Sequence, residues 1–155
     1  MRSHRLICSI LIFLTLCIPP AKAEEGYTDE DGNPIVVPNA KTAYSLEKPG
    51  IHQKDAAAHD PVLTSRLLVQ GLETTRVLKI TVAHPLPKTY KKGAKFPIKA
   101  IYLVDKDGIV VGYRTYSIDD TQVLFETKIN GVINYLEIYV ECREHGTWLK
   151  KIRLT

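Results

Sequence analysis

The sequence predicts an all-β protein, an antiparallel β-sandwich of about seven strands. Short runs rich in Leu, Val, Ile and Thr follow one another after residue 60, and turn-forming residues separate them at regular spacing. Only 54–59, which contains three alanines, has room for a helical turn or two.

A cleaved signal peptide is expected over 1–23. Arg2 and Arg5 precede a nearly unbroken apolar run over 6–18, and Ala21-Lys22-Ala23 is a small-x-small cleavage site. Because the run is short for a bilayer, we expect a periplasmic or secreted protein with no membrane span after cleavage.

The mature chain is expected to consist of an extended polar arm over 24–54 and one β-sandwich domain over 55–155. The arm is rich in turn formers. Without the signal peptide the chain has 18 basic and 17 acidic side chains, so nucleic-acid binding loses its electrostatic basis. No glycine-rich phosphate loop, nucleophile elbow or zinc-protease helix occurs in the sequence.

Two turn signals organise the predicted strands. Asp105-Lys106-Asp107-Gly108 and Asn130-Gly131 each predict a hairpin between the flanking runs. The expected strands are 63–70, 76–83, 96–104, 109–116, 122–129, 132–141 and 148–154.

Cys142 is the only cysteine outside the expected signal peptide, so no disulfide can form within the mature chain. It ends a predicted strand, His145 follows in the next loop, and His84 ends another strand before Pro85. Strand ends at one pole of a sandwich can bring these side chains together, and a thiolate with imidazoles suits iron, copper or zinc. The alternative is an inert buried thiol beside ordinary surface histidines.

Three segments carry a family resemblance. Residues 142–148 read Cys-x-x-His-Gly-x-Trp, 84–86 read His-Pro-Leu, and 59–63 read His-x-Pro-x-aliphatic. The first resembles the iron-site motif of the superoxide reductase family, which includes neelaredoxin and the C-terminal domain of desulfoferrodoxin. The other two are similar to that family's His-Pro-Met and His-x-Pro-x-aliphatic segments, in the same order.

The resemblance implies an immunoglobulin-like sandwich with one mononuclear, non-haem iron. Carried over residue by residue, His59, His84 and His145 are equatorial ligands and Cys142 is the axial ligand. Such a centre reduces superoxide to hydrogen peroxide, and an external electron-donor protein then reduces the iron again.

The chain departs from the family at its fourth histidine. Counting forward from His84 places Tyr90 there, whereas counting back from the turn at 107–108 places Pro97 there. His52 from the arm, a tyrosinate from Tyr90, a water molecule or an empty position are the alternatives, and a missing ligand leaves room for an altered activity.

The family's catalytic lysine has no clear match, because Ala58 precedes His59. Lys48 and Lys54 are the candidates for attracting an anionic substrate, and the alternative is that both are solvated charges of the arm.

Two other functions fit parts of the sequence. His84, Cys142 and His145 also form a His-Cys-His set typical of blue-copper electron-transfer sites, although the mature chain has no methionine for the axial position. A non-enzymatic, partner-binding sandwich of the SoxZ type also carries a His-Pro segment, but it would need neither Cys142 nor His145.

Overall fold

The computed structural model describes residues 27–28, 32–47, 53–86 and 95–155. The expected signal peptide lies outside these residues. The elements are β1 (Tyr44–Ser45), α1 (Gln53–His59), β2 (Pro61–Gln70), β3 (Glu73–Val82), β4 (Ile98–Val104), β5 (Val110–Thr115), β6 (Val123–Asn130), β7 (Tyr135–Cys142) and β8 (Gly146–Arg153). Within the described ranges, no helix is long and apolar enough to cross a membrane.

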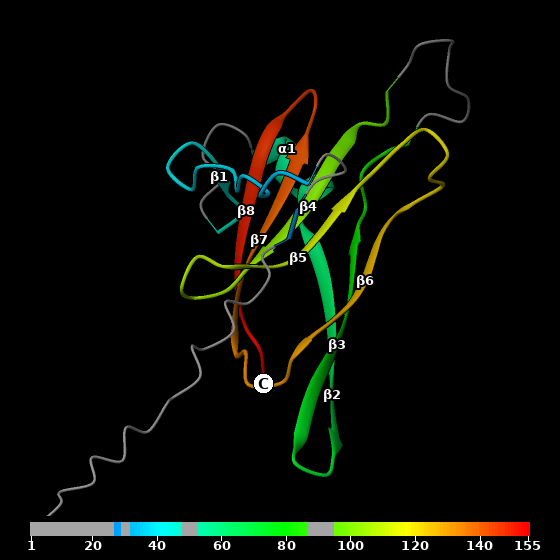
Figure 1. Ribbon diagram of the computed structural model, residues 1–155. Helices are drawn as coiled ribbons and strands as arrows, with labels where there is room; N and C mark the ends of the chain where they lie inside the picture. The colour runs from blue at the N-terminus through cyan, green and yellow to red at the C-terminus, as the bar shows by residue number, and fades with distance from the viewer. Residues whose placement is uncertain (1–26, 29–31, 48–52, 87–94) are drawn as a thin grey trace, which may run out of the picture.

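The strands form two sheets packed against each other (Figure 1). One sheet has the order β1-β8-β7-β4-β5 and the other β2-β3-β6. Strand pairs are antiparallel except for the short parallel pair of β1 with β8. This is the strand order of an immunoglobulin-like sandwich, so the predicted fold class is confirmed, with the two-residue β1 as an additional strand.

The core lies between the two sheets and follows from the alternation along each strand. In β3, Leu78, Ile80 and Val82 are buried whereas Lys79 is exposed. The facing sheet contributes a second set of fully buried side chains, Ile101, Leu103, Leu136, Ile138 and Val140.

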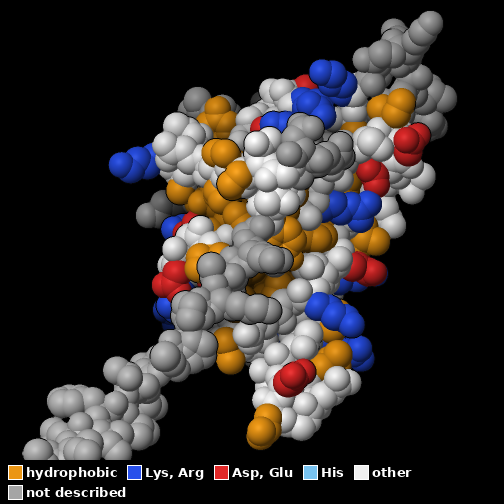
Figure 2. Space-filling model, in the orientation of Figure 1, with side chains coloured by type: hydrophobic (Ala, Val, Ile, Leu, Met, Phe, Trp, Pro, Cys, Tyr) orange, Lys and Arg blue, Asp and Glu red, His pale blue; other side chains and the backbone are white. Residues whose placement is uncertain are grey.

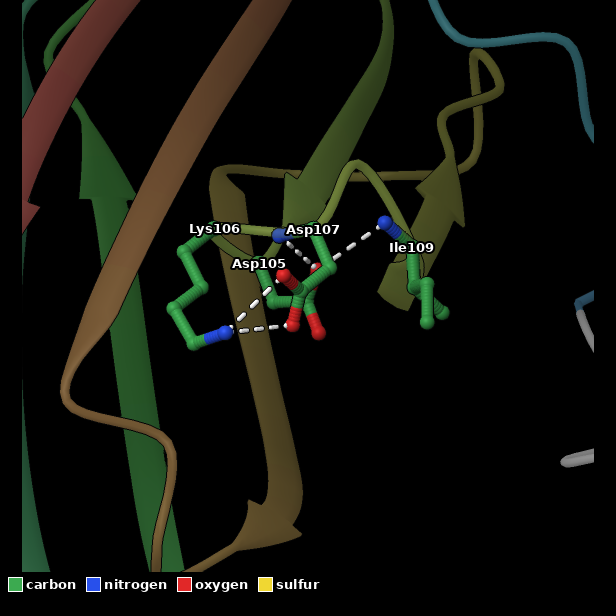
Figure 3. A network of polar contacts seen from close by, with 4 residues as sticks. All are labelled: Asp105, Lys106, Asp107 and Ile109. Carbon is green, nitrogen blue, oxygen red and sulfur yellow. Dashed lines mark hydrogen bonds and ion pairs between the residues drawn. The ribbon is translucent and has the colours of Figure 1, made fainter.

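The hairpin predicted at residues 105–108 is confirmed, because β4 pairs with β5. The carboxylate of Asp105 accepts the backbone N–H groups of Asp107 and Ile109, each at 2.9 Å (Figure 3). Lys106 pairs with Asp107 at 2.7 Å, and Gly108 takes a positive φ of 81°. The aspartate and the glycine therefore close the turn.

The hairpin predicted at Asn130-Gly131 is wrong, because β6 pairs with β3 whereas β7 pairs with β4 and β8. The chain turns there, with Asn130 Oδ1 accepting the N–H of Val132 at 3.1 Å, and then crosses to the other sheet. Gly131 allows the backbone to approach Thr74 closely. Its N–H donates to the Thr74 carbonyl at 2.9 Å, and a Cβ would lie 2.6 Å from the Thr74 side chain.

The described part of the arm packs along the β8 edge of the five-stranded sheet, where β1 pairs with β8, and on the outer face of that sheet. The N–H of Leu46 donates to the Leu149 carbonyl at 3.0 Å. Ile35, Val37 and Ala43 pack against the buried cluster on that face. The arm therefore contributes to packing beside β7 and β8, the strands that flank the turn with His145.

The β2–β3 hairpin extends beyond the sandwich at the pole away from α1 (Figure 1). Its tip carries hydrophobic side chains in solvent, at the bottom of the view in Figure 2, and Leu72, Val69 and Leu67 are exposed there. The opposite pole of the sandwich holds the histidines and the cysteine.

Candidate metal centre

Four potential ligands meet at the pole beside α1. His59 ends α1, His84 follows β3, Cys142 ends β7, and His145 lies between β7 and β8. One ligand atom from each residue lies within 4.8 Å of all the others. The structure thus brings together the four residues that the sequence singled out as metal ligands.

The strand register explains this meeting. β2 and β3 pair antiparallel with Pro61 opposite Val82. A residue just before β2 therefore lies near a residue just after β3, which places His59 beside His84. Their ring centroids are 4.8 Å apart.

A tight hairpin presents the thiol and the third imidazole. Cys142 pairs with Gly146, whose φ is +76°, so the turn contains only Arg143, Glu144 and His145. The backbone N–H and the Nε of Arg143 donate to the carbonyls of residues 97 and 96, each at 2.9 Å. This hairpin brings His145 Nδ1 to 3.5 Å from Cys142 Sγ.

His59 is fully buried, and its two ring nitrogens have different surroundings. Nδ1 lies 2.6 Å from the Asp55 carbonyl, which can only accept, so Nδ1 carries a proton and, in the neutral ring, Nε2 carries the lone pair. Nε2 is buried and forms no hydrogen bond of normal length among the described residues, although the ring lies close enough to Cys142 to lower the pKa of that thiol. A buried nitrogen without a partner is costly, and a metal ion bound at Nε2 would satisfy it.

His84 is oriented in a similar way. Its Nδ1 lies 2.9 Å from the Pro85 carbonyl, and its Nε2 lies 3.7 Å from Cys142 Sγ. The hydrogen bond with Cys142 raises the pKa of His84, although partial burial lowers it. His84 and His145 are half-buried whereas His59 is fully buried, so the described residues enclose the centre less on the side of His84 and His145 than on the side of His59.

The surroundings of Cys142 favour its thiolate form. Burial raises its pKa, but the imidazoles of His59 and His84 and the backbone amides of Glu144 and His145 stabilise the thiolate and lower the pKa to about 5. Since the thiolate is the form that binds metals, the centre offers one sulfur and three nitrogen donors. This donor set suits iron, copper or zinc.

Of the remaining sequence candidates, the structure describes only the side chain of Pro97. Lys48, Tyr90 and the side chain of Lys54 lie outside what the structure describes. The carbonyl of Pro97 accepts the N–H of Arg143, but its ring has no ligand atom. The proline position therefore cannot supply the fourth imidazole.

Sequence reasoning missed Lys150, which bonds to the two residues after His59. The alternation of side chains along the strand could have identified it, because Trp148, Lys150 and Ile152 lie on the same, inward face. A comparison of the chain with protein-family models finds no match, and a comparison with curated proteins finds no significant match.

Proposed function

We propose that the protein is an exported, mononuclear non-haem iron protein that reduces superoxide to hydrogen peroxide, as superoxide reductases do. One observation carries the proposal: the ligand atoms of three imidazoles and one thiol converge within 4.8 Å. The Cys-x-x-His-Gly-x-Trp resemblance of residues 142–148 supports iron as the metal.

Iron bound by these residues would supply one electron to superoxide, which with two protons gives hydrogen peroxide, and an external electron-donor protein would restore the electron. Cys142 contributes negative charge to the centre, since its pKa is lowered to about 5. The half-buried edges of His84 and His145 leave a side by which a small anion can approach. His59 and Trp148 close the other side, because both are fully buried. Lys48 and Lys54 remain the candidates for attracting the anion.

Metal analysis of the anaerobically purified mature chain tests the proposal, together with EPR of the oxidised protein. We expect one iron per chain and a high-spin ferric signal, followed by rapid oxidation of the reduced centre when superoxide is mixed in by stopped flow. Cys142→Ser and His145→Ala are each expected to abolish stoichiometric iron binding in a folded protein. Glu144→Gln is the matched control, because Glu144 is exposed in the same turn. Iron retained by both ligand variants contradicts the proposal.

Copper electron transfer is the second candidate. The contacts of Cys142 Sγ with His84 and His145, at 3.7 and 3.5 Å, give the two imidazoles and one thiolate that blue-copper sites use. Bound copper with a narrow hyperfine splitting would favour this function over superoxide reduction. A mature chain that takes up no metal even after reconstitution would favour a partner-binding sandwich of the SoxZ type.

A further inference from the structure

Lys150 lies where the alternation of β8 calls for an apolar side chain. Trp148, Ile152 and Leu154 occupy the same face of this segment and pack in the core between the sheets. Lys151, on the opposite face, pairs instead with Glu137 at 2.9 Å. Only 30% of the Lys150 side chain is exposed, and an ammonium group that is partly withdrawn from water needs acceptors for its charge.

Two acceptors come from the segment that follows His59. Lys150 Nζ donates to the Asp60 carboxylate at 2.5 Å and to the Pro61 carbonyl at 3.0 Å. Pro61 is buried and begins β2, which belongs to the other sheet. The lysine therefore ties β8 to the junction of α1 and β2, one residue from His59.

His59 depends on such support because it ends a helix of only seven residues. Trp148 holds the His59 ring by stacking at 4.8 Å, and Lys150, two positions further along the same face, holds the backbone that follows. The ring and the chain of this residue are thus both fixed by β8.

We propose that Lys150 is a positioning residue that holds His59 in the metal centre, an inference that rests on the proposed function. Lys150 acts through Asp60 and Pro61 and contacts no ligand atom of the centre. Groups that orient a metal ligand in this way typically change metal affinity by about 10 to 100-fold when they are removed.

A surface ion pair without a role in the centre is the competing explanation. The Lys150 and Asp60 side chains are 30% and 47% exposed, and ion pairs at such exposure contribute little to stability. The two explanations differ in the expected effect of Lys150→Met. If Lys150 is a positioning residue, the substitution alters metal affinity. If Lys150 belongs only to a surface ion pair, the substitution leaves metal affinity unchanged and changes the melting temperature little.

Titration of the metal-free mature protein with Co²⁺ distinguishes them. We expect Lys150→Met to weaken Co²⁺ binding by about 10-fold and to change the visible spectrum of the bound Co²⁺. Lys150→Arg should retain the wild-type affinity and spectrum, since arginine can reach the same acceptors. Lys151→Met is the matched control, because it removes a neighbouring ion pair of the same strand, and it should leave Co²⁺ binding unchanged.

A second measurement shows whether the effect passes through His59. In a His59→Ala background, Lys150→Met should cause no further loss of Co²⁺ affinity, because the residue that it positions is gone. Wild-type affinity in Lys150→Met, or an equal loss with and without His59, would overturn the inference while leaving the metal centre intact. Failure of the wild-type protein to bind any metal would instead overturn the proposed function, and this inference with it.

Discussion

The imidazole of His59 lies flat against the indole of Trp148, with ring centroids 4.8 Å apart and planes 9° from parallel. Both side chains are fully buried. The stack joins the helix end that carries one candidate ligand to the strand that follows the other two. Since Trp148 is the only tryptophan of the chain, its fluorescence reports on the surroundings of this one ring, which include the His59 stack.

Metal binding is therefore expected to quench the Trp148 emission. A paramagnetic ion bound to His59 would lie next to the stacked indole, so titration with Co²⁺ should reduce the fluorescence until one ion per chain is bound. The His59→Ala variant is the control, and its emission should respond weakly to the same additions. Unchanged emission while wild-type protein demonstrably binds Co²⁺ would show that the metal is held elsewhere.

The thiol of Cys142 is expected to titrate near pH 5 in the metal-free protein, because the imidazoles and backbone amides around it outweigh the effect of burial. The ultraviolet absorbance of the thiolate, followed against pH, measures this directly, with Cys142→Ser as the blank. A midpoint near the ordinary thiol pKa of about 8.5 would contradict the electrostatics of the centre.

The same lowered pKa makes the stability of the metal-free protein depend on pH. A group with a lower pKa in the folded state stabilises the fold fully above its unfolded pKa of about 8.5. For Cys142 this contribution declines below that pH and is lost as the pH falls through about 5. Urea unfolding should therefore show a gap between wild type and Cys142→Ser that narrows as the pH is lowered from 8.5 to 5. A gap that is constant over this range would contradict the prediction.

Local sequence signals predicted most of the fold but not every strand partner. The turn at Asp105 to Gly108 was predictable because its aspartate and glycine close a hairpin by bonds within the turn itself. Asn130-Gly131 gave an equally good local signal, yet the chain there crosses between sheets, because Gly131 is bonded to Thr74 of a distant strand. No local pattern contains that pairing.

For the candidate centre, too, local sequence signals identify some residues but not the contacts between distant segments. His84, Cys142 and His145 could be singled out because each lies at the end of a predicted strand or in the following turn, and His59 was identified only through the family resemblance. That His59 lies beside His84 follows from the antiparallel register of β2 and β3, which pattern alone does not fix. Lys150 was overlooked because its partners Asp60 and Pro61 are about ninety positions away in the sequence.

Gly146→Ala is expected to destabilise the hairpin that carries Cys142 and His145. A non-glycine residue at a φ of +76° costs about 1–2 kcal/mol, and the added Cβ would also approach the Tyr44 ring to 3.2 Å. Gly108→Ala is the matched control, because it has a φ of +81° and open space around the Cβ. Urea unfolding should show a larger loss for Gly146→Ala, and Co²⁺ affinity should fall in that variant alone. Equal losses of stability would show that the Tyr44 contact adds nothing.

Gly131→Ala is expected to lower stability without affecting the metal centre. An added Cβ would lie 2.6 Å from the Thr74 side chain and 2.7 Å from its backbone carbon, so the crossing between the sheets must shift, and overpacking of this kind typically costs about 1–3 kcal/mol. The position is at the end of β6, whereas the candidate ligands lie at the opposite pole. Urea unfolding should reveal the loss of stability. Co²⁺ titration without denaturant, at a temperature well below thermal unfolding, should give the wild-type affinity. A weaker Co²⁺ affinity in Gly131→Ala would mean that the two poles are coupled through the sandwich. In that case a fall in affinity for Gly146→Ala could not be assigned to the hairpin that contains Gly146.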